Sequence, residues 1–199
     1  MRLERWAIFG WLATAQLAGT GALFAVFGTG VDGVRAWVLA TAWISASLFL
    51  LAFAARPLRQ FVRSDATGAL LRNRRHVGVS GAFAHFLHLI AIVWLLNGFA
   101  HPGEDAVDVP TLIGGGLGFA FYFSLALTSS DAAVRALGRR NWKRLHTTGM
   151  YYVWFIFAFT FLGGAVSEGN AVSASFLLLF AAVIPLRITA RLRSRSAAA

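Results

Sequence analysis

Long stretches without charged residues determine the expected architecture of this chain. Five of them hold at least 20 residues, at 6–28, 36–55, 77–100, 109–130 and 147–166, and a shorter one follows at 169–186. An α-helix rises about 1.5 Å per residue, so about 20 apolar residues cross a hydrocarbon core of about 30 Å. The pattern therefore predicts six transmembrane helices, and the first is expected to be a spanning helix and not a cleaved signal.

The overall composition favours a membrane protein and excludes other classes. Hydrophobic residues make up 58% of the 199 residues and charged residues only 13%, and the mean hydropathy is +0.66. A soluble domain carries about 25% charged residues, so an ordinary soluble enzyme is excluded. The chain has no cysteine, which excludes disulfides, iron–sulfur clusters and thiolate sites. We expect an all-α membrane protein, a six-transmembrane-helix bundle.

Basic residues fall almost entirely on one side of the predicted bundle. With the N-terminus in the cytoplasm, every Lys and Arg except Arg35 lies in a cytoplasmic segment. This is the positive-inside pattern, so both termini are expected to be cytoplasmic. Topology thus explains most of the net charge of +10, and nucleic-acid binding is not expected. A second interpretation stays open, in which the inner loops at 56–75 and 135–144 dock an acidic redox protein or anionic membrane lipid.

No segment between the predicted helices is long enough to form a second domain. Residues 1–199 are therefore expected to form a single transmembrane domain. The sequence has neither a glycine-rich dinucleotide motif after a strand nor a phosphate-binding P-loop, so it shows no means of holding NAD(P)H or ATP. Ionisable residues inside the membrane become the functional hypothesis, and in this chain they are histidines.

His88 lies near the middle of the stretch 77–100, where an imidazole without a partner is costly. Two kinds of partner are equally expected: a metal or heme iron, or a hydrogen bond to a nearby Ser, Thr or backbone carbonyl. His85 lies about 60° away around the helix and is expected to be a hydrogen-bonded packing residue. His101 is expected to be a solvated residue of an outer turn.

His76 directly follows a run of basic residues at 74–75, and His146 follows a second run at 143–144 after a single leucine. Each is expected to open a helix that runs from inside to outside, which places the two at similar depth, as a bis-histidine heme site requires. His88 lies about 18 Å deeper than His76. Its partner on the fifth helix would stand near position 158 or 159, where neither side chain can ligate iron.

Three stretches together make the chain similar to the ferric-reductase-like transmembrane domain family. They are 55–59, Arg74-Arg75-His76-Val77-Gly78 leading to Leu87-His88, and 127–129 leading through Leu137-Gly138 and Trp142 to Leu145-His146. The resemblance covers residues 40–160. Within the family, the chain resembles the branch of heme-binding membrane subunits that serve bacterial methionine sulfoxide reduction.

The resemblance implies a b-type heme between the third and fifth helices, in a multi-pass protein of the bacterial inner membrane. His88 and His146 match ligand positions of the family, and Arg75 and His76 stand at the inner end, where relatives have a basic or ligating residue. Phe159 occupies a position where many members have a further histidine, so one heme is expected and not two.

The resemblance also implies an electron-transfer role. Electrons would pass from the cytoplasmic side to an acceptor outside, with a separate flavin reductase or quinol as donor and a periplasmic reductase as partner. We therefore expect the membrane component of an oxidoreductase and not a complete enzyme. The alternative is a heme-less six-helix membrane protein, a transporter or scaffold derived from the same fold.

Overall fold

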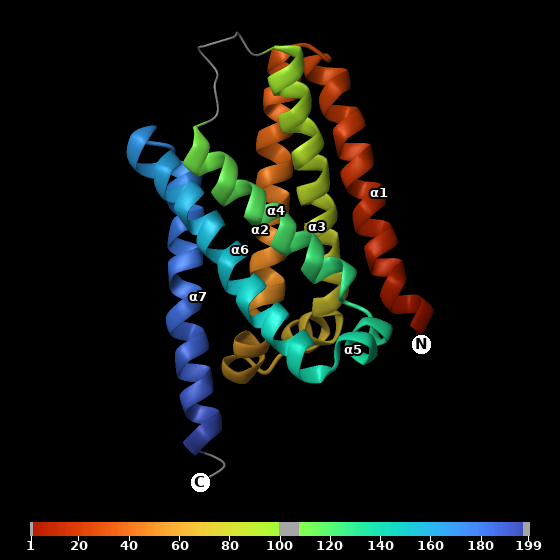
Figure 1. The fold of residues 1–199 in the computed structure, drawn as a ribbon, viewed down its shortest axis with the longest axis vertical. Helices are drawn as coiled ribbons and strands as arrows, with labels where there is room; N and C mark the ends of the chain where they lie inside the picture. Colours follow the sequence, from red (N-terminus) through yellow and green to blue (C-terminus); the bar gives the residue numbers. More distant parts are fainter. Residues whose placement is uncertain (1, 100–107, 197–199) are drawn as a thin grey trace. The chain divides into compact units, whose positions relative to one another are not determined.

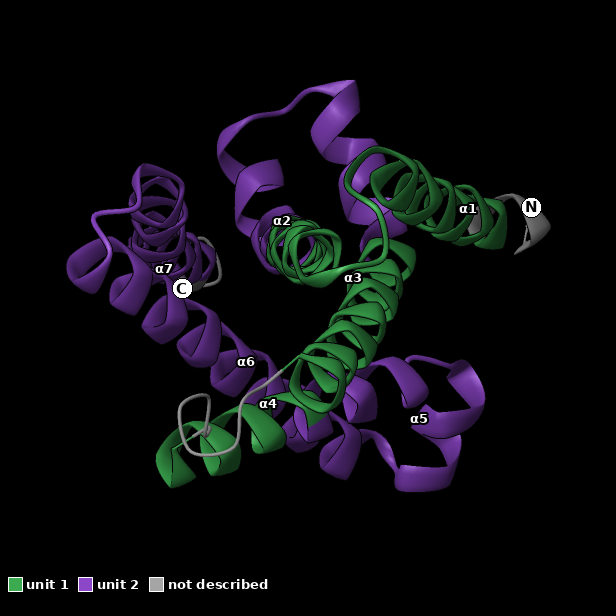
Figure 2. Cartoon of the chain, turned by 90° about the horizontal axis from the view of Figure 1, so that it is seen from above, with its two compact units in different colours: residues 1–49, 75–119 green, residues 50–74, 120–199 purple. Residues whose placement is uncertain are grey.

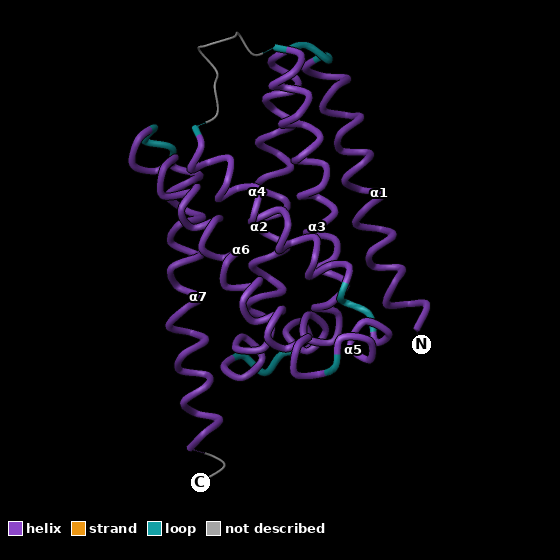
Figure 3. The backbone as a smooth tube through the Cα atoms, in the orientation of Figure 1, coloured by secondary structure: helices purple, strands orange, loops and turns teal. Residues whose placement is uncertain are grey.

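The computed structural model describes residues 2–99 and 108–196, which leaves His101 outside the described residues. Within these ranges the regular structure is entirely helical, and short loops separate the helices (Figures 1 and 3). In chain order the helices are α1 (Arg2–Phe27), α2 (Val31–Phe61), α3 (Asp65–Gly98), α4 (Val109–Leu127), α5 (Asp131–Leu137), α6 (Arg139–Ser167) and α7 (Ala171–Ser196). All of these except α5 are long and apolar enough to cross a membrane. The predicted all-α fold with six spans is confirmed.

The helices around the inner basic segment are longer than the apolar stretches indicated. Only residues 62–64 separate α2 from α3, whereas the sequence predicted a loop over 56–75. Arginine, leucine and alanine are strong helix formers, so charge ends an apolar stretch without ending the helix. Ser64 and Thr67 bond each other's backbone N–H through their hydroxyls, at 3.2 and 3.3 Å, and so cap α3. The prediction that His76 and His146 open their helices was therefore wrong, since α3 begins at Asp65 and α6 at Arg139.

The short helix α5 was not predicted, although the sequence carries its start signal. Ser130 caps it by accepting a hydrogen bond from the backbone N–H of Ala133 at 3.0 Å. Asp131 follows in the first turn, where a negative charge is favourable. The chain then turns at Gly138, whose φ of 74° suits glycine, and continues into α6.

The helices form two compact units, shown in separate colours in Figure 2. Unit 1 contains residues 1–49 and 75–119, and unit 2 contains residues 50–74 and 120–199. Helices α2, α3 and α4 therefore contribute residues to both units. The single domain expected over residues 1–199 stays a prediction.

In unit 1, polar contacts hold α1 to its neighbours. The buried core includes Trp37 of α2 and Leu87 of α3. The Trp37 indole N–H donates to Thr20 Oγ1 at 3.0 Å, and Gln16 Nε2 donates to the carbonyl of Ser80 at 3.3 Å. Apolar contact alone drives helix association weakly in lipid, so these interhelical hydrogen bonds help to fix α1.

In unit 2, α6 and α7 pack closely along their length. The Trp154 indole N–H donates to the carbonyl of Phe180 at 2.9 Å, and the rings of Phe161 and Phe176 stack with centroids 4.6 Å apart. A Cβ atom at Gly164 would lie 2.6 Å from a side-chain oxygen of α7. A glycine at this position therefore permits the close approach of the two helices.

Candidate functional site

His88 is held by α2 through one nitrogen of its ring. Its Nδ1 lies 3.0 Å from the carbonyl oxygen of Val38 and 3.2 Å from Thr41 Oγ1. The Thr41 hydroxyl itself donates to the carbonyl of Trp37 at 2.7 Å. A carbonyl oxygen only accepts hydrogen bonds, so the bond to Val38 requires that Nδ1 carry the ring proton.

This arrangement has a direct chemical consequence for His88. With the proton on Nδ1, the lone pair of the neutral imidazole lies on Nε2. Metal-binding histidines typically donate their other ring N–H to a carbonyl or carboxylate, which fixes the ring and its tautomer. His88 can therefore keep its hydrogen bond and also bind iron, since the hydrogen bond uses Nδ1 and an iron would use Nε2.

His85 is held by α2 in the same manner. Its Nδ1 lies 3.2 Å from Ser45 Oγ, and that hydroxyl donates to the carbonyl of Gly81 at 3.1 Å. The ring stacks near that of His88, with centroids 5.6 Å apart, and lies 4.3 Å from the ring of Phe119. The expected hydrogen-bonded packing role agrees with these contacts. Because the Ser45 hydroxyl donates to Gly81, it accepts from His85, so Nδ1 carries the ring proton as in His88. The lone pair on Nε2 makes His85 the alternative ligand to test.

His76 and Arg75 lie earlier on α3. The His76 side chain is 5% exposed, and its ring meets the edge of the Trp6 ring at a centroid distance of 5.0 Å. Its carbonyl accepts a hydrogen bond from the Ser80 hydroxyl at 2.9 Å. At 12 positions before His88, about 18 Å along a helix, His76 cannot share an iron with it.

His146 belongs to unit 2, where α4 and α6 determine its surroundings. Its Nε2 lies 3.0 Å from Thr128 Oγ1, and the ring stacks on the Trp142 indole with centroids 4.1 Å apart. The Trp142 N–H in turn donates to the carbonyl of Thr128 at 2.9 Å. Thr128 therefore contacts both aromatic side chains at the start of α6.

The tautomer of His146 differs from that of His88. The Thr128 hydroxyl donates to the carbonyl of Ser124 at 2.5 Å, so its oxygen accepts from His146 and Nε2 carries the proton. To bind iron through Nε2, the His146 ring must give up Thr128. The pairing of His88 with His146 rests on the sequence, because the two residues belong to different units.

Phe159, where the resemblance implied a further histidine in many relatives, lies on the exposed side of α6. It is 63% exposed and stacks on Phe155 with centroids 6.0 Å apart. Both rings are therefore part of the surface of unit 2.

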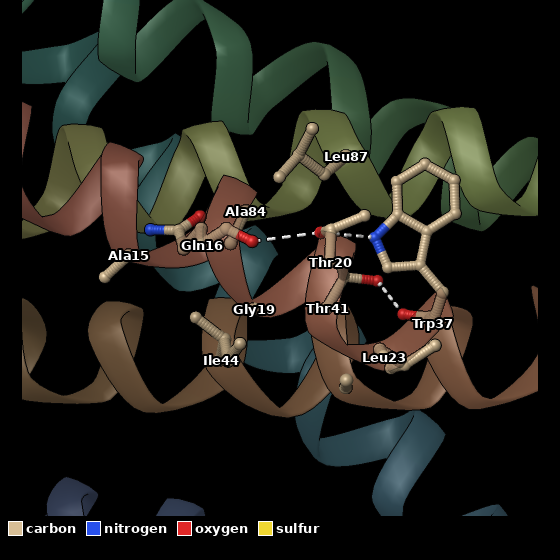
Figure 4. Close-up of a pocket in the computed structure, with 11 residues that line it drawn as sticks. Ala15, Gln16, Gly19, Thr20, Leu23, Trp37, Thr41, Ile44, Ala84 and Leu87 are labelled. Carbon is tan, nitrogen blue, oxygen red and sulfur yellow. Dashed lines mark hydrogen bonds between the residues drawn. The ribbon is translucent and has the colours of Figure 1, made fainter. Parts of the chain in front are cut away.

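A cavity of about 140 Å³ opens between α1, α2 and α3 of unit 1 (Figure 4). Its walls are mostly apolar and carry four polar side chains, those of Gln16, Thr20, Trp37 and Thr41. A cavity of about 150 Å³ in another protein admits benzene, so this one has room for a single ring. Gln16 is 8% exposed, and its Oε1 is buried without a hydrogen-bond partner among the described residues.

Hydrogen bonds link polar groups along this cavity (Figure 4), and one of its lining residues, Thr41, contacts His88. The Thr20 hydroxyl donates to the carbonyl of Gln16 and accepts from the Trp37 indole. The Trp37 carbonyl accepts from Thr41, whose oxygen contacts His88. Sequence reasoning missed Thr41 and its neighbour Ser45, although two polar residues four positions apart in an apolar stretch share one helix face.

Curated proteins similar to this chain are mainly heme-binding subunits. The chain is 34% identical over 119 residues to the protein-methionine-sulfoxide reductase heme-binding subunit MsrQ of Polaromonas naphthalenivorans, a match covering 59% of this chain and 53% of that protein. It is 37% identical over 101 residues to MsrQ of Xanthomonas campestris pv. campestris strain 8004, covering 50% and 44%. It is also 27% identical over 104 residues to the magnetosome protein MamZ of Paramagnetospirillum magneticum, covering 51% and 16%.

No family model matches the chain, and no solved structure matches it. The chain spans about half the length of the MsrQ proteins that it matches. The six apolar helices, together with this similarity, indicate a multi-pass protein of the bacterial inner membrane. The chain resembles the MsrQ heme-binding subunits, as its histidine-containing stretches predicted.

Proposed function

We propose that this chain is the heme b-binding electron-transfer subunit of an inner-membrane oxidoreductase. The observation that carries the proposal is the bond between His88 Nδ1 and the carbonyl of Val38, which leaves Nε2 as the lone-pair donor for iron. The similarity to MsrQ heme-binding subunits supports the same cofactor. Both termini face the cytoplasm in this proposal, in keeping with the positive-inside pattern.

In this proposal His88 and His146 are the two iron ligands. Heme would supply one-electron transfer, and two imidazole ligands would suit that task because substrate need not bind iron. The protein fixes the ring of His88 through Val38 and Thr41. His146 takes the second position once its Nε2 is released from Thr128. Arg75 and His76 stand at the inner end of the site, as basic residues or as a further ligand.

The donor is a cytoplasmic flavoprotein or a quinol, and the cavity of unit 1 favours a quinol. The buried Oε1 of Gln16 needs a hydrogen-bond donor, and the remaining walls are largely apolar. A quinol offers hydroxyl donors on a small ring that dissolves in lipid. Its oxidation to quinone releases two electrons and two protons, so a one-electron carrier must accept twice.

The acceptor in this proposal lies outside the membrane, and a periplasmic reductase of methionine sulfoxide is the partner that the MsrQ names indicate. The chain is then a component of an oxidoreductase and not the complete enzyme. The rival function is a heme-less transporter or scaffold. The hydrogen bond of His88 would also satisfy that role, so heme content decides between the two.

The deciding experiment is an absorption spectrum of the detergent-purified full chain from heme-replete cells, before and after dithionite. The proposal expects a Soret band that shifts on reduction and a pyridine hemochrome of the heme b type. Preparations that hold heme-free folded protein would instead support the transporter or scaffold. Circular dichroism serves as the control for folding.

A further inference from the structure

Three arginines from three helices of unit 2 gather without an acidic partner. Arg56 lies on α2, Arg74 on α3 and Arg187 on α7. The positive charges of Arg56 and Arg187 are near enough to repel that of Arg74. None of the three forms an ion pair with a carboxylate within residues 2–99 and 108–196. Like charges held together repel one another unless an anion joins them.

Arg187 is fixed in place by a backbone defect in α2. Pro57 has no N–H, so the carbonyl of Phe53, four residues earlier, loses its usual helical donor. The Arg187 guanidinium donates to that carbonyl and lies over the Phe53 ring, 3.8 Å from its centroid. The Tyr151 ring lies on the same guanidinium, at 5.5 Å. Arg187 is therefore a positioned cation, and its Nε is buried without a hydrogen-bond partner among the described residues.

The cluster also stands at a defined membrane depth. The apolar stretch 36–55 ends immediately before Arg56, and the stretch 169–186 ends immediately before Arg187. Arg74 lies shortly before the stretch 77–100 begins. All three arginines therefore stand where hydrocarbon gives way to lipid headgroups, and Tyr151 is a residue type typical of that boundary.

We propose that Arg56, Arg74 and Arg187 bind the phosphodiester of an anionic phospholipid. Guanidinium groups match phosphate oxygens with paired hydrogen bonds, and basic pockets between transmembrane helices bind acidic lipid headgroups. The acyl chains would lie on the apolar surface nearby, where Leu51 of α2 is 44% exposed and Ile188 of α7 is 52% exposed. This site is independent of the proposed heme function and uses none of its residues.

The test is native mass spectrometry of the full chain, purified in detergent, washed free of lipid and titrated with phosphatidylglycerol. Arg56→Gln and Arg74→Gln are the main variants, because both side chains are exposed and glutamine is also a good helix former. Arg187→Lys is the third, which keeps the charge but loses the paired hydrogen bonds. Arg140→Gln is the matched control, because it removes the same charge at an exposed arginine in the first turn of α6.

We expect one tightly bound phosphatidylglycerol, with affinity about fivefold to tenfold lower in each glutamine variant and unchanged in the control. Equal binding of phosphatidylcholine would overturn the proposal, since it would show a general lipid coat. Competition by inorganic phosphate at the lipid's own affinity would indicate a soluble anion and also overturn it. An equal loss of phosphatidylglycerol affinity in Arg140→Gln would also overturn the proposal. So would unchanged lipid binding in arginine variants that no longer bind an acidic protein.

Discussion

His88 and Val38 are joined across two helices, with Nδ1 of the imidazole 3.0 Å from the carbonyl oxygen. A backbone carbonyl cannot donate, so this bond determines which ring nitrogen holds the proton. A histidine can thus be satisfied inside an apolar helix and still present a lone pair. The relationship makes the His88 ring suitable for iron without any change of tautomer.

Replacing His88 by alanine should remove bound heme, because the substitution deletes a ligand. His85→Ala is the matched control, since His85 is held by Ser45 in the same way and lies one turn earlier on α3. The heme-to-protein ratio, measured by pyridine hemochrome on purified protein, should fall to near zero in His88→Ala and stay near the wild-type value in His85→Ala. The reverse result would assign the ligand to His85.

Thr41→Val should weaken heme binding without abolishing it. The substitution removes the hydroxyl beside His88 Nδ1 but leaves the bond to Val38 intact. Partners behind a metal ligand typically contribute 10–100-fold in affinity, and we expect about tenfold here, together with a shifted heme reduction potential. Heme transfer to apomyoglobin and a redox titration measure the two effects. Thr41→Ser should restore both, and an unchanged potential in Thr41→Val would show that Thr41 has no influence on the ligand.

Thr128→Val should strengthen heme retention. In the structure Thr128 occupies the Nε2 atom of His146, so it competes with iron for that nitrogen. A hydrogen bond contributes about 1 kcal/mol net, which corresponds to about a fivefold slower release of heme. Heme transfer to apomyoglobin is again the measurement. Faster release in Thr128→Val would mean that Thr128 supports the bound ring and does not compete with iron.

Gln16→Leu should slow electron entry from a quinol while leaving heme content unchanged. It removes the buried acceptor Oε1 from the cavity of unit 1. Losing one hydrogen bond should raise the concentration of duroquinol, a single-ring quinol, for half-maximal heme reduction by about fivefold to tenfold. Stopped-flow spectroscopy measures this rate. Reduction by dithionite should not change, and Gln60→Leu, at an exposed glutamine of unit 2, should behave as wild type. Equal duroquinol kinetics in Gln16→Leu and wild type would favour the flavoprotein donor.

Gly33→Ala should destabilise the turn between α1 and α2. A Cβ atom at Gly33 would lie 1.8 Å from the carbonyl oxygen of Gly28, so the backbone must shift. We expect a loss of about 1–3 kcal/mol and a lower Tm in detergent, measured by thermal unfolding. Gly30→Ala is the control, because a Cβ atom there meets no atom within 4 Å. Equal Tm values for the two variants would contradict this packing.

The six spans could be predicted from sequence because a membrane imposes one simple requirement, a charge-free stretch of sufficient length. The helix ends could not be predicted from that pattern. Arg56 ends one apolar stretch and Arg75 precedes the next, yet both lie inside helices, so the loop expected over 56–75 shrinks to residues 62–64. Helix α5 depends on a local cap at Ser130, which a search for long apolar stretches does not detect.

The histidines could be identified from sequence because ionisable groups are rare within apolar helices. Their ring tautomers could not, because these depend on contacts between helices. His88 bonds to a carbonyl 50 positions earlier in the chain, and His146 bonds to Thr128, the residue directly after α4. Which nitrogen can bind iron is therefore a property of the tertiary structure.

Electron paramagnetic resonance of the oxidised, purified chain tests the central claim most directly. Two imidazole ligands make ferric heme low-spin, so the wild-type protein should show a low-spin signal, and His88→Ala and His146→Ala should each lose it. A high-spin wild-type signal, or a low-spin signal that survives both substitutions, would contradict ligation by these two histidines.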